Sequence, residues 1–131
     1  MAVDAATDGL QVEGLRIAAG ERVLVHDVSL RIGAGELVAL VGSSGSGKTV
    51  TARALLGMLP FQPGRVGGTI TVRSGGRVLQ PSTEADFRSL RGGTIGMLWQ
   101  DARAALDPLW TIAAQVREAI ALSGASEPPE A

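Results

Sequence analysis

The segment GSSGSGKT, residues 42–49, constrains this chain most strongly because it lies between an apolar run and a helical pattern. It satisfies G-x-x-x-x-G-K-[ST], in which glycines let the backbone turn tightly and approach an anion. The loop amides form a nest for phosphate oxygens, and the following helix adds the positive end of its dipole. The predicted nucleotide-binding residues are Gly42, Ser43, Ser44, Gly45, Ser46, Gly47, Lys48, Thr49 and Val50.

Lys48 is the only lysine among twelve basic residues, and it stands where the pattern requires this residue type. A compact ammonium fits among crowded phosphate oxygens, whereas the guanidinium of arginine is a planar fork. The hydroxyl of Thr49 is suited to coordinate Mg²⁺. The alternative is a flexible Gly/Ser turn that matches by chance, and the strand–loop–helix context argues against it.

The residues before the loop predict β structure. Residues 10–17, 22–25 and 28–32 are aliphatic stretches expected to form short antiparallel strands joined by tight turns. A turn is expected at residues 33–36. Residues 37–41, LVALV, form a continuous apolar run that is typical of a strand buried on both faces.

Helical spacing begins after Gly47. The apolar residues that share one face are Ala52, Leu55, Leu56 and Leu59. Prolines and glycines in residues 59–68 break this pattern, and residues 69–80 predict a β-hairpin around Ser-Gly-Gly.

The carboxyl-terminal part of the chain predicts two helices and a strand. Thr83 and Asp86 form a capping-box pattern at the start of a short helix, with Asp in place of the usual Glu. Residues 94–100 have strand character. The apolar stripe of the helix expected at residues 111–122 consists of Ile112, Val116, Ala119 and Ile120.

Composition excludes several classes of protein. The formal net charge of −1 gives no electrostatic case for nucleic acid as a partner, and without cysteine there is neither a disulfide framework nor a thiolate metal site. The longest uncharged runs have eleven residues, against the ~20 apolar residues of a membrane-spanning helix. The amino terminus carries acids where a signal peptide has basic residues. Membrane association is therefore expected only through a protein partner.

Two motifs resemble those of ATP-binding subunits of ABC transporters, especially the peptide and nickel importer group. Residues 26–60 are similar to the family's opening, from the first β-layer into the phosphate loop, and residues 91–120 resemble its Gln-loop region. The resemblance covers about residues 10–120. It implies an α/β fold with a phosphate-loop NTPase core of the RecA-like type, incomplete here, and an antiparallel β subdomain at the amino terminus.

The same resemblance implies an ATPase that couples ATP binding and hydrolysis, with Mg²⁺, to transport. Residues 10–122 would form the amino-terminal portion of the nucleotide-binding domain, between a tail at 1–9 and a flexible tail at 123–131. The implied partners are permease subunits and a second ATP-binding subunit, at the cytoplasmic face of the membrane. The transported solute would be a peptide, nickel or a similar small solute.

The Gln-loop glutamine of the family corresponds to Gln100. The resemblance implies that its side-chain oxygen reaches Mg²⁺ and the water near the γ-phosphate, so Thr49 and Gln100 are the implied metal-site residues. Residues 101–108 would carry the nucleotide state to the permease, and the helix at 111–122 would contact it or pack in the domain core. Trp99 and Trp110 are expected to be packing residues.

Three departures from the family pattern limit what this chain is expected to do. Ala19 stands near the usual aromatic platform for adenine, which weakens base stacking. Ala102 replaces a proline after the Gln-loop acid. The signature loop, the strand ending in Asp-Glu and the switch histidine are all missing, and His26 is expected at a turn. No catalytic residue is therefore predicted in this chain, and ATP binding is expected without appreciable turnover.

Two alternative functions stay open at this point. The first is another phosphate-loop enzyme such as a small nucleotide kinase, against which the Gln-loop block and the preceding strands argue. The second is a truncated or degenerate chain that binds nucleotide or a partner without catalysis. Because strands of the family's parallel sheet are missing, residues 37–41 are expected to lose neighbours and leave apolar faces exposed.

Overall fold

The chain divides into two compact units, Met1–Phe87 and Arg88–Ala131, in a computed structural model that describes residues 8–124. Of the two tails expected from the sequence, residues 1–7 and 125–131 lie outside this described part.

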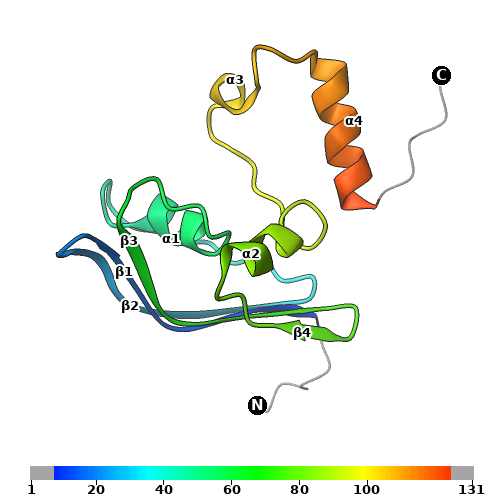
Figure 1. The fold of residues 1–131 in the computed structure, drawn as a ribbon. Coiled ribbons are helices and arrows are strands. Elements are labelled where there is room, and N and C mark those ends of the chain that lie inside the picture. The colour runs from blue at the N-terminus through cyan, green and yellow to red at the C-terminus, as the bar shows by residue number, and fades with distance from the viewer. Residues whose placement is uncertain (1–7, 125–131) are drawn as a thin grey trace. The chain divides into compact units, whose positions relative to one another are not determined.

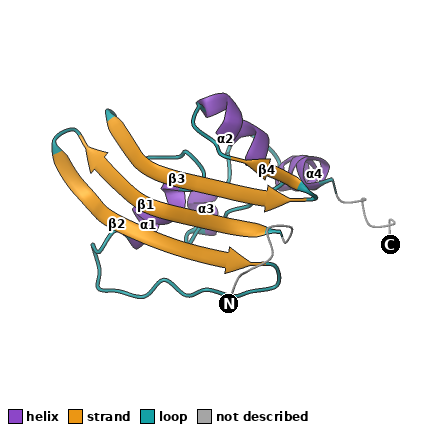
Figure 2. Ribbon diagram, turned by 90° about the horizontal axis from the view of Figure 1, so that it is seen from below, coloured by secondary structure: helices purple, strands orange, loops and turns teal. Residues whose placement is uncertain are grey.

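An antiparallel sheet of order β2-β1-β3-β4 forms the first unit (Figures 1 and 2). The strands are β1 (Gly9–Ala19), β2 (Arg22–Gly33), β3 (Gly64–Ser74) and β4 (Arg77–Leu79). β1 is paired along both edges, so that Leu10 lies opposite Ile32 on one side and Val72 on the other. β1 and β2 confirm the antiparallel strands predicted at the amino terminus, and β3 and β4, which follow the phosphate loop in the sequence, complete the same sheet.

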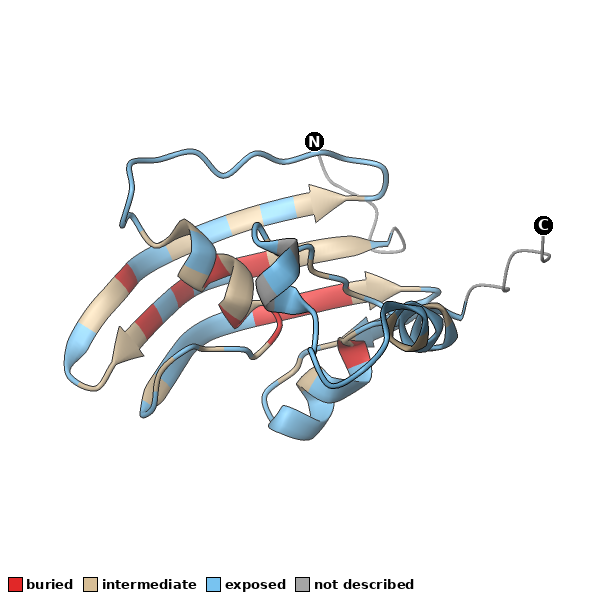
Figure 3. Ribbon diagram, turned by 90° about the horizontal axis from the view of Figure 1, so that it is seen from above, coloured by how far each residue is buried: buried red, intermediate tan, exposed pale blue. Residues whose placement is uncertain are grey.

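The side chains of β1 form the centre of the core. Val12, Leu15 and Ile17 are at most 1% exposed, and Figure 3 shows buried positions along β1 and β3. The other buried apolar residues of this unit are Val25, Ala54, Leu56, Ile70 and Val72. Burial of one large aliphatic side chain is worth about 1.5–3 kcal/mol, so the three β1 residues form the main apolar anchor.

A β-bulge explains why Val12 and Leu15 are both buried although three positions separate them. The pairing register of β1 shifts between Val12 and Leu15 on the β2 edge and between Glu13 and Arg16 on the β3 edge, so that both shifts span Gly14. Gly68 on β3 faces the bulge with φ +90°, and a Cβ there would lie 2.5 Å from the carbonyl oxygens of Glu13 and Gly14. The extra residue at the bulge lets both Val12 and Leu15 point into the core. The close approach of the Glu13 and Gly14 carbonyls leaves room only for glycine at position 68.

The boundaries of the strands differ from the sequence prediction. Residues 22–25 and 28–32 belong to one continuous strand, β2, where two had been expected. β3 begins at Gly64, inside the stretch expected to be a breaker, because its glycines pair with β1. The turn at 33–36 is confirmed by the Glu36 amide, which donates to the Gly33 carbonyl at 3.1 Å. The β3–β4 hairpin, which turns at Gly75 and Gly76, is also confirmed.

The predicted strand at residues 37–41 was wrong. The segment has no regular secondary structure, and Leu37 and Val41 are 96% and 88% exposed. A strand buried on both faces needs hydrogen-bonded neighbours, and the sheet formed by the described residues ends at β2 and β4. Residues 37–41 are apolar as a buried strand would be, but among the described residues no strand pairs with them.

Residues 94–100 show the same deviation in the second unit. The predicted strand is absent, and only an isolated bridge pairs Ile95 with Arg91. Leu98 is 97% exposed.

Four helices complete the described chain. They are α1 (Lys48–Ala54), α2 (Glu84–Leu90), α3 (Ala102–Ala105) and α4 (Ile112–Ser123). α1 is shorter than its apolar pattern predicted, and Thr51 and Ala54 are its buried positions. α3 was not predicted. α4 is confirmed, and its N-cap residue is Thr111, whose hydroxyl accepts from the Ala114 amide at 3.2 Å.

The capping box at the start of α2 is confirmed in both directions. The Asp86 amide donates to the Thr83 hydroxyl at 3.2 Å, and the Asp86 carboxylate accepts from the amides of Ser82 and Thr83 at 3.0 and 2.8 Å. The hydrogen bond from the Ser82 amide is the largest cause, followed by that from the Thr83 amide, of lowering the pKa of Asp86 from 3.8 to about 2.

We predict a pH-dependent contribution of Asp86 to stability. Its pKa is lower in the folded chain, so the stabilisation is complete above the unfolded value of 3.8 and disappears as pH falls toward about 2. The free energy of unfolding in urea should therefore separate the parent from Asp86→Asn at neutral pH and bring them together in acid. Glu21→Gln, at an exposed turn position, is the control. If the free energies of unfolding of the parent and Asp86→Asn differ by the same amount at every pH, the Asp86 carboxylate does not have this role.

Candidate functional site

The phosphate loop leads directly into α1. Gly47 occupies the N-cap position with φ +93°, and its carbonyl accepts from the Thr51 amide at 2.8 Å. Within the loop, the Ser46 amide donates to the Ser43 carbonyl at 3.3 Å, and Gly45 has φ +80°. The two left-handed glycines turn the chain sharply before the helix, as the motif predicted.

The Lys48 side chain turns back across the loop. Its Nζ donates to the carbonyls of Gly42 and Ser43 at 2.7 and 2.6 Å, and it lies 3.4 Å from Ser46 Oγ. These contacts hold the ammonium at the centre of the loop and draw both loop ends together. The only lysine of the chain therefore serves as the internal cation of this loop.

Two of the loop glycines are fixed by close neighbours. A Cβ on Gly42 would lie 2.7 Å from Ser46 Oγ, and one on Gly47 would lie 3.0 Å from Val25 Cγ2 on β2. Val25 is itself buried in the sheet. The loop thus rests on β2 at Gly47, which fixes the start of α1 relative to the sheet.

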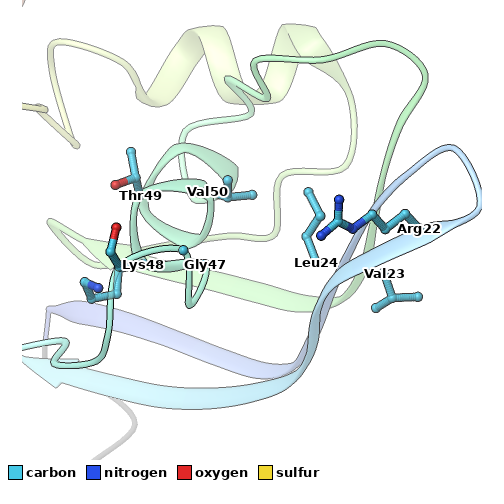
Figure 4. A pocket seen from close by; sticks show the side chains of 9 residues that line it. Arg22, Val23, Leu24, Gly47, Lys48, Thr49 and Val50 are labelled. Atoms are coloured by element: carbon cyan, nitrogen blue, oxygen red, sulfur yellow. The ribbon is translucent and has the colours of Figure 1, made fainter.

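A cavity of about 570 Å³ opens beside the loop, between α1 and the first residues of β2 (Figure 4). The lining residues are Arg22, Val23, Leu24, Ser44, Gly45, Gly47, Lys48, Thr49 and Val50. They include two cations and no carboxylate, and the volume is within the range of small-ligand sites. The cavity is therefore electrostatically suited to an anion with an apolar or aromatic portion.

Sequence reasoning found the loop side of this cavity but missed the β2 side. Arg22, Val23 and Leu24 enter the site because the β1–β2 hairpin brings them beside α1, more than twenty residues later in the chain. No local motif marks them. The one signal was their position directly after the β-turn that follows Ala19.

The residues present fit a magnesium nucleotide. Lys48 offers a cation to phosphate, and the hydroxyl of the exposed Thr49 is available at the first residues of α1. Among residues 8–124, no three His, Cys, Asp or Glu side chains gather into a metal site.

Gln100 lies in the second unit, where its side chain is exposed at a bend. The segment that follows is organised by a residue that sequence reasoning did not single out. Gln115 Oε1 accepts from the Asp107 amide at 2.9 Å, and its Nε2 donates to the carbonyls of Asp107 and Trp110 at 2.9 and 3.1 Å. The side chain of Gln115 thus closes the turn that precedes α4.

This turn presents apolar side chains to solvent. Leu109 and Trp110 are 89% and 57% exposed, and Ile112 and Val116 on α4 are also exposed. No residue of α4 is buried, so its apolar stripe is not a core stripe in the described chain. Trp110 does not have the buried environment expected for a packing residue.

The sequence of this chain matches the family profile described as ABC transporter over residues 25–127. The match covers both the phosphate loop and the Gln-loop region. The chain therefore belongs to the ABC transporter family, as the two motifs predicted. Its fold is that of part of an ABC-type ATPase domain with an antiparallel sheet, in which β1 and β2 precede the phosphate loop and β3 and β4 follow it.

Curated relatives are ATP-binding proteins. The uncharacterized ABC transporter ATP-binding protein YejF of Escherichia coli (strain K12) is 42% identical over 110 residues, which are 83% of this chain and 20% of the relative. The glutathione import ATP-binding protein GsiA of Salmonella typhimurium is 41% identical over 129 residues, covering 91% of this chain and 20% of GsiA. A Brucella abortus protein whose name includes "peptide import ATP-binding protein" is 41% identical over 117 residues, 83% of this chain and 35% of that protein.

The chain thus spans between a fifth and about a third of the length of these relatives. A solved structure of a bacterial Atm1-family ABC exporter with ATP bound is 25% identical, covers 70% of this chain and 15% of the exporter, and has a TM-score of 0.48. Within residues 8–124, no helix combines the length and the apolar character needed to cross a membrane.

We predict that Gly47→Ala destabilises the first unit more than Gly45→Ala. Both replacements place an L side chain at positive φ, which costs roughly 1–2 kcal/mol. Only the alanine at position 47 also meets Val25, because nothing lies within 4 Å of a Cβ at position 45. Urea denaturation measures the free energy of unfolding of each variant. Equal decreases for Gly47→Ala and Gly45→Ala would contradict the prediction, because they would mean that the Val25 side chain moves aside without destabilising the unit.

Proposed function

We propose that this chain binds Mg-ATP through residues 42–50 and is the nucleotide-binding portion of an ABC importer for peptides or similar small solutes. In the assembled transporter, ATP binding and hydrolysis are coupled to transport. The observation that carries the proposal is Lys48, whose ammonium is held within 2.7 Å of two loop carbonyls beside a cavity without carboxylates.

Magnesium, when bound, neutralises charge on the phosphates. Thr49 and Gln100 are the proposed protein ligands of this ion, and the amides of the loop and of α1 are the proposed phosphate donors. No residue of this chain is proposed as the catalytic base. The proposed orienting groups for the catalytic water are a carboxylate of an Asp-Glu strand and a signature loop, neither of which is among residues 1–131.

The proposed partners are permease subunits and a second ATP-binding subunit, at the cytoplasmic face of a membrane. The exposed apolar side chains of Leu109, Trp110 and Ile112 support a protein contact at the turn before α4. The names of the relatives support import of glutathione or peptides. A nucleotide kinase, the alternative from another class, is set aside because the family match includes the Gln-loop region.

We predict that Lys48→Ala weakens Mg-ATP binding at least roughly tenfold, because charge-assisted hydrogen bonds contribute about 1.5–3 kcal/mol each. Calorimetric titration of the purified chain with Mg-ATP measures the affinity. Lys48→Arg keeps the charge but brings a planar fork into the loop, so it should also bind weakly.

Circular dichroism of each variant provides the control for folding. Affinities that are equal for the parent and both variants would reject the loop as the phosphate site. A folded parent chain that binds no Mg-ATP would favour the non-catalytic, degenerate chain considered from the sequence.

A further inference from the structure

The end of the cavity away from Lys48 is formed by the start of β2. Figure 4 shows the side chains of Arg22 and Leu24 directed toward Val50, while Val23 points the other way. In this view Val50 lies between Lys48 and Arg22. Arg22 is thus at a different part of the cavity from the phosphate-binding cation.

No aromatic residue lines this cavity. The four aromatic residues of the chain are Phe61, Phe87, Trp99 and Trp110. A nucleotide base is a flat aromatic group that needs a planar or apolar face to lie against. The side chains available for that purpose are Arg22, Leu24 and Val50, and the guanidinium of Arg22 is the planar one among them.

The backbone of Arg22 is well anchored. It pairs with Ala19 at the first rung of the β1–β2 ladder, and the preceding turn is tied down by the Gly20 amide, which donates to the Pro63 carbonyl at 3.1 Å. The side chain itself is exposed. An exposed guanidinium on a fixed backbone position can swing over a ligand without moving the strand.

We propose that Arg22 is the base-recognition residue of this site, with its guanidinium stacked on the base of the bound nucleotide and Leu24 and Val50 packed beneath. The assignment rests on the proposed function, since it requires a nucleotide in the cavity. Arginine stacks on aromatic faces through cation–π attraction and stacks on bases in single-stranded nucleic acid sites. Because every base has such a face, this contact favours nucleotides over simple polyphosphates with little preference among bases.

The test compares two probes, Mg-ATP and magnesium tripolyphosphate, which carries the phosphates without a base. Arg22→Ala should weaken Mg-ATP binding by about three- to thirtyfold. Binding of tripolyphosphate should stay within about twofold of the parent, which also shows that the phosphate loop is intact. Arg22→Trp should restore Mg-ATP binding, whereas Arg22→Lys, which keeps only the charge, should not.

Arg31→Ala is the matched control, because Arg31 is an exposed arginine of the same strand outside the cavity lining. It should change neither affinity, and Lys48→Ala should weaken both. Equal weakening of both probes by Arg22→Ala would make Arg22 a phosphate contact and overturn the proposal. Unchanged Mg-ATP binding in Arg22→Ala would also overturn it and leave the proposed function standing. A parent chain that binds neither probe would reject the proposed function and this assignment together.

Discussion

The pairing of β1 with strands on both of its edges is the interaction on which the rest of this structure depends. The two ladders supply hydrogen-bond partners to the backbone amides and carbonyls of β1. The fully buried side chains of β1, Val12, Leu15 and Ile17, form the centre of the core. α1 contacts β1, and Gly47 rests against Val25 of β2. The phosphate loop and both walls of the cavity therefore take their positions from this sheet, and a site for a charged ligand is built from segments that are mostly exposed.

The same requirement for strand partners explains why residues 37–41 do not form a strand. Residues 37–41 carry the apolar pattern of a central strand, yet Leu37, Val38, Leu40 and Val41 are all exposed. A strand exists only when neighbouring strands accept its hydrogen bonds, and the sheet of the described residues offers none to this segment. The phosphate loop is consequently anchored at its helix end, through Gly47 and α1, and not through the segment that precedes it.

Sequence patterns predicted the elements whose stabilising contacts are local. The Thr83–Asp86 capping box, the Gly75–Gly76 hairpin and the Thr111 start of α4 each depend on residues within a few positions of one another. The patterns failed where the local structure depends on residues that are distant in the sequence. The strand predicted at 94–100 has no partner strand among residues 8–124, and the bulge at Gly14 depends on Gly68. Arg22 could not be assigned to the cavity because it reaches the site only through the β1–β2 hairpin.

Amide hydrogen exchange along the purified chain tests most directly whether the β1 ladder forms and holds the loop while residues 37–41 remain unpaired. We expect the slowest exchange at the amides of β1 near Val12, Leu15 and Ile17, and exchange close to that of an unstructured chain at residues 37–41. Protection at 37–41 equal to that of β1 would show that this segment is a paired strand. The phosphate loop would then be anchored through the segment before it, which contradicts an anchor at Gly47 and α1 alone.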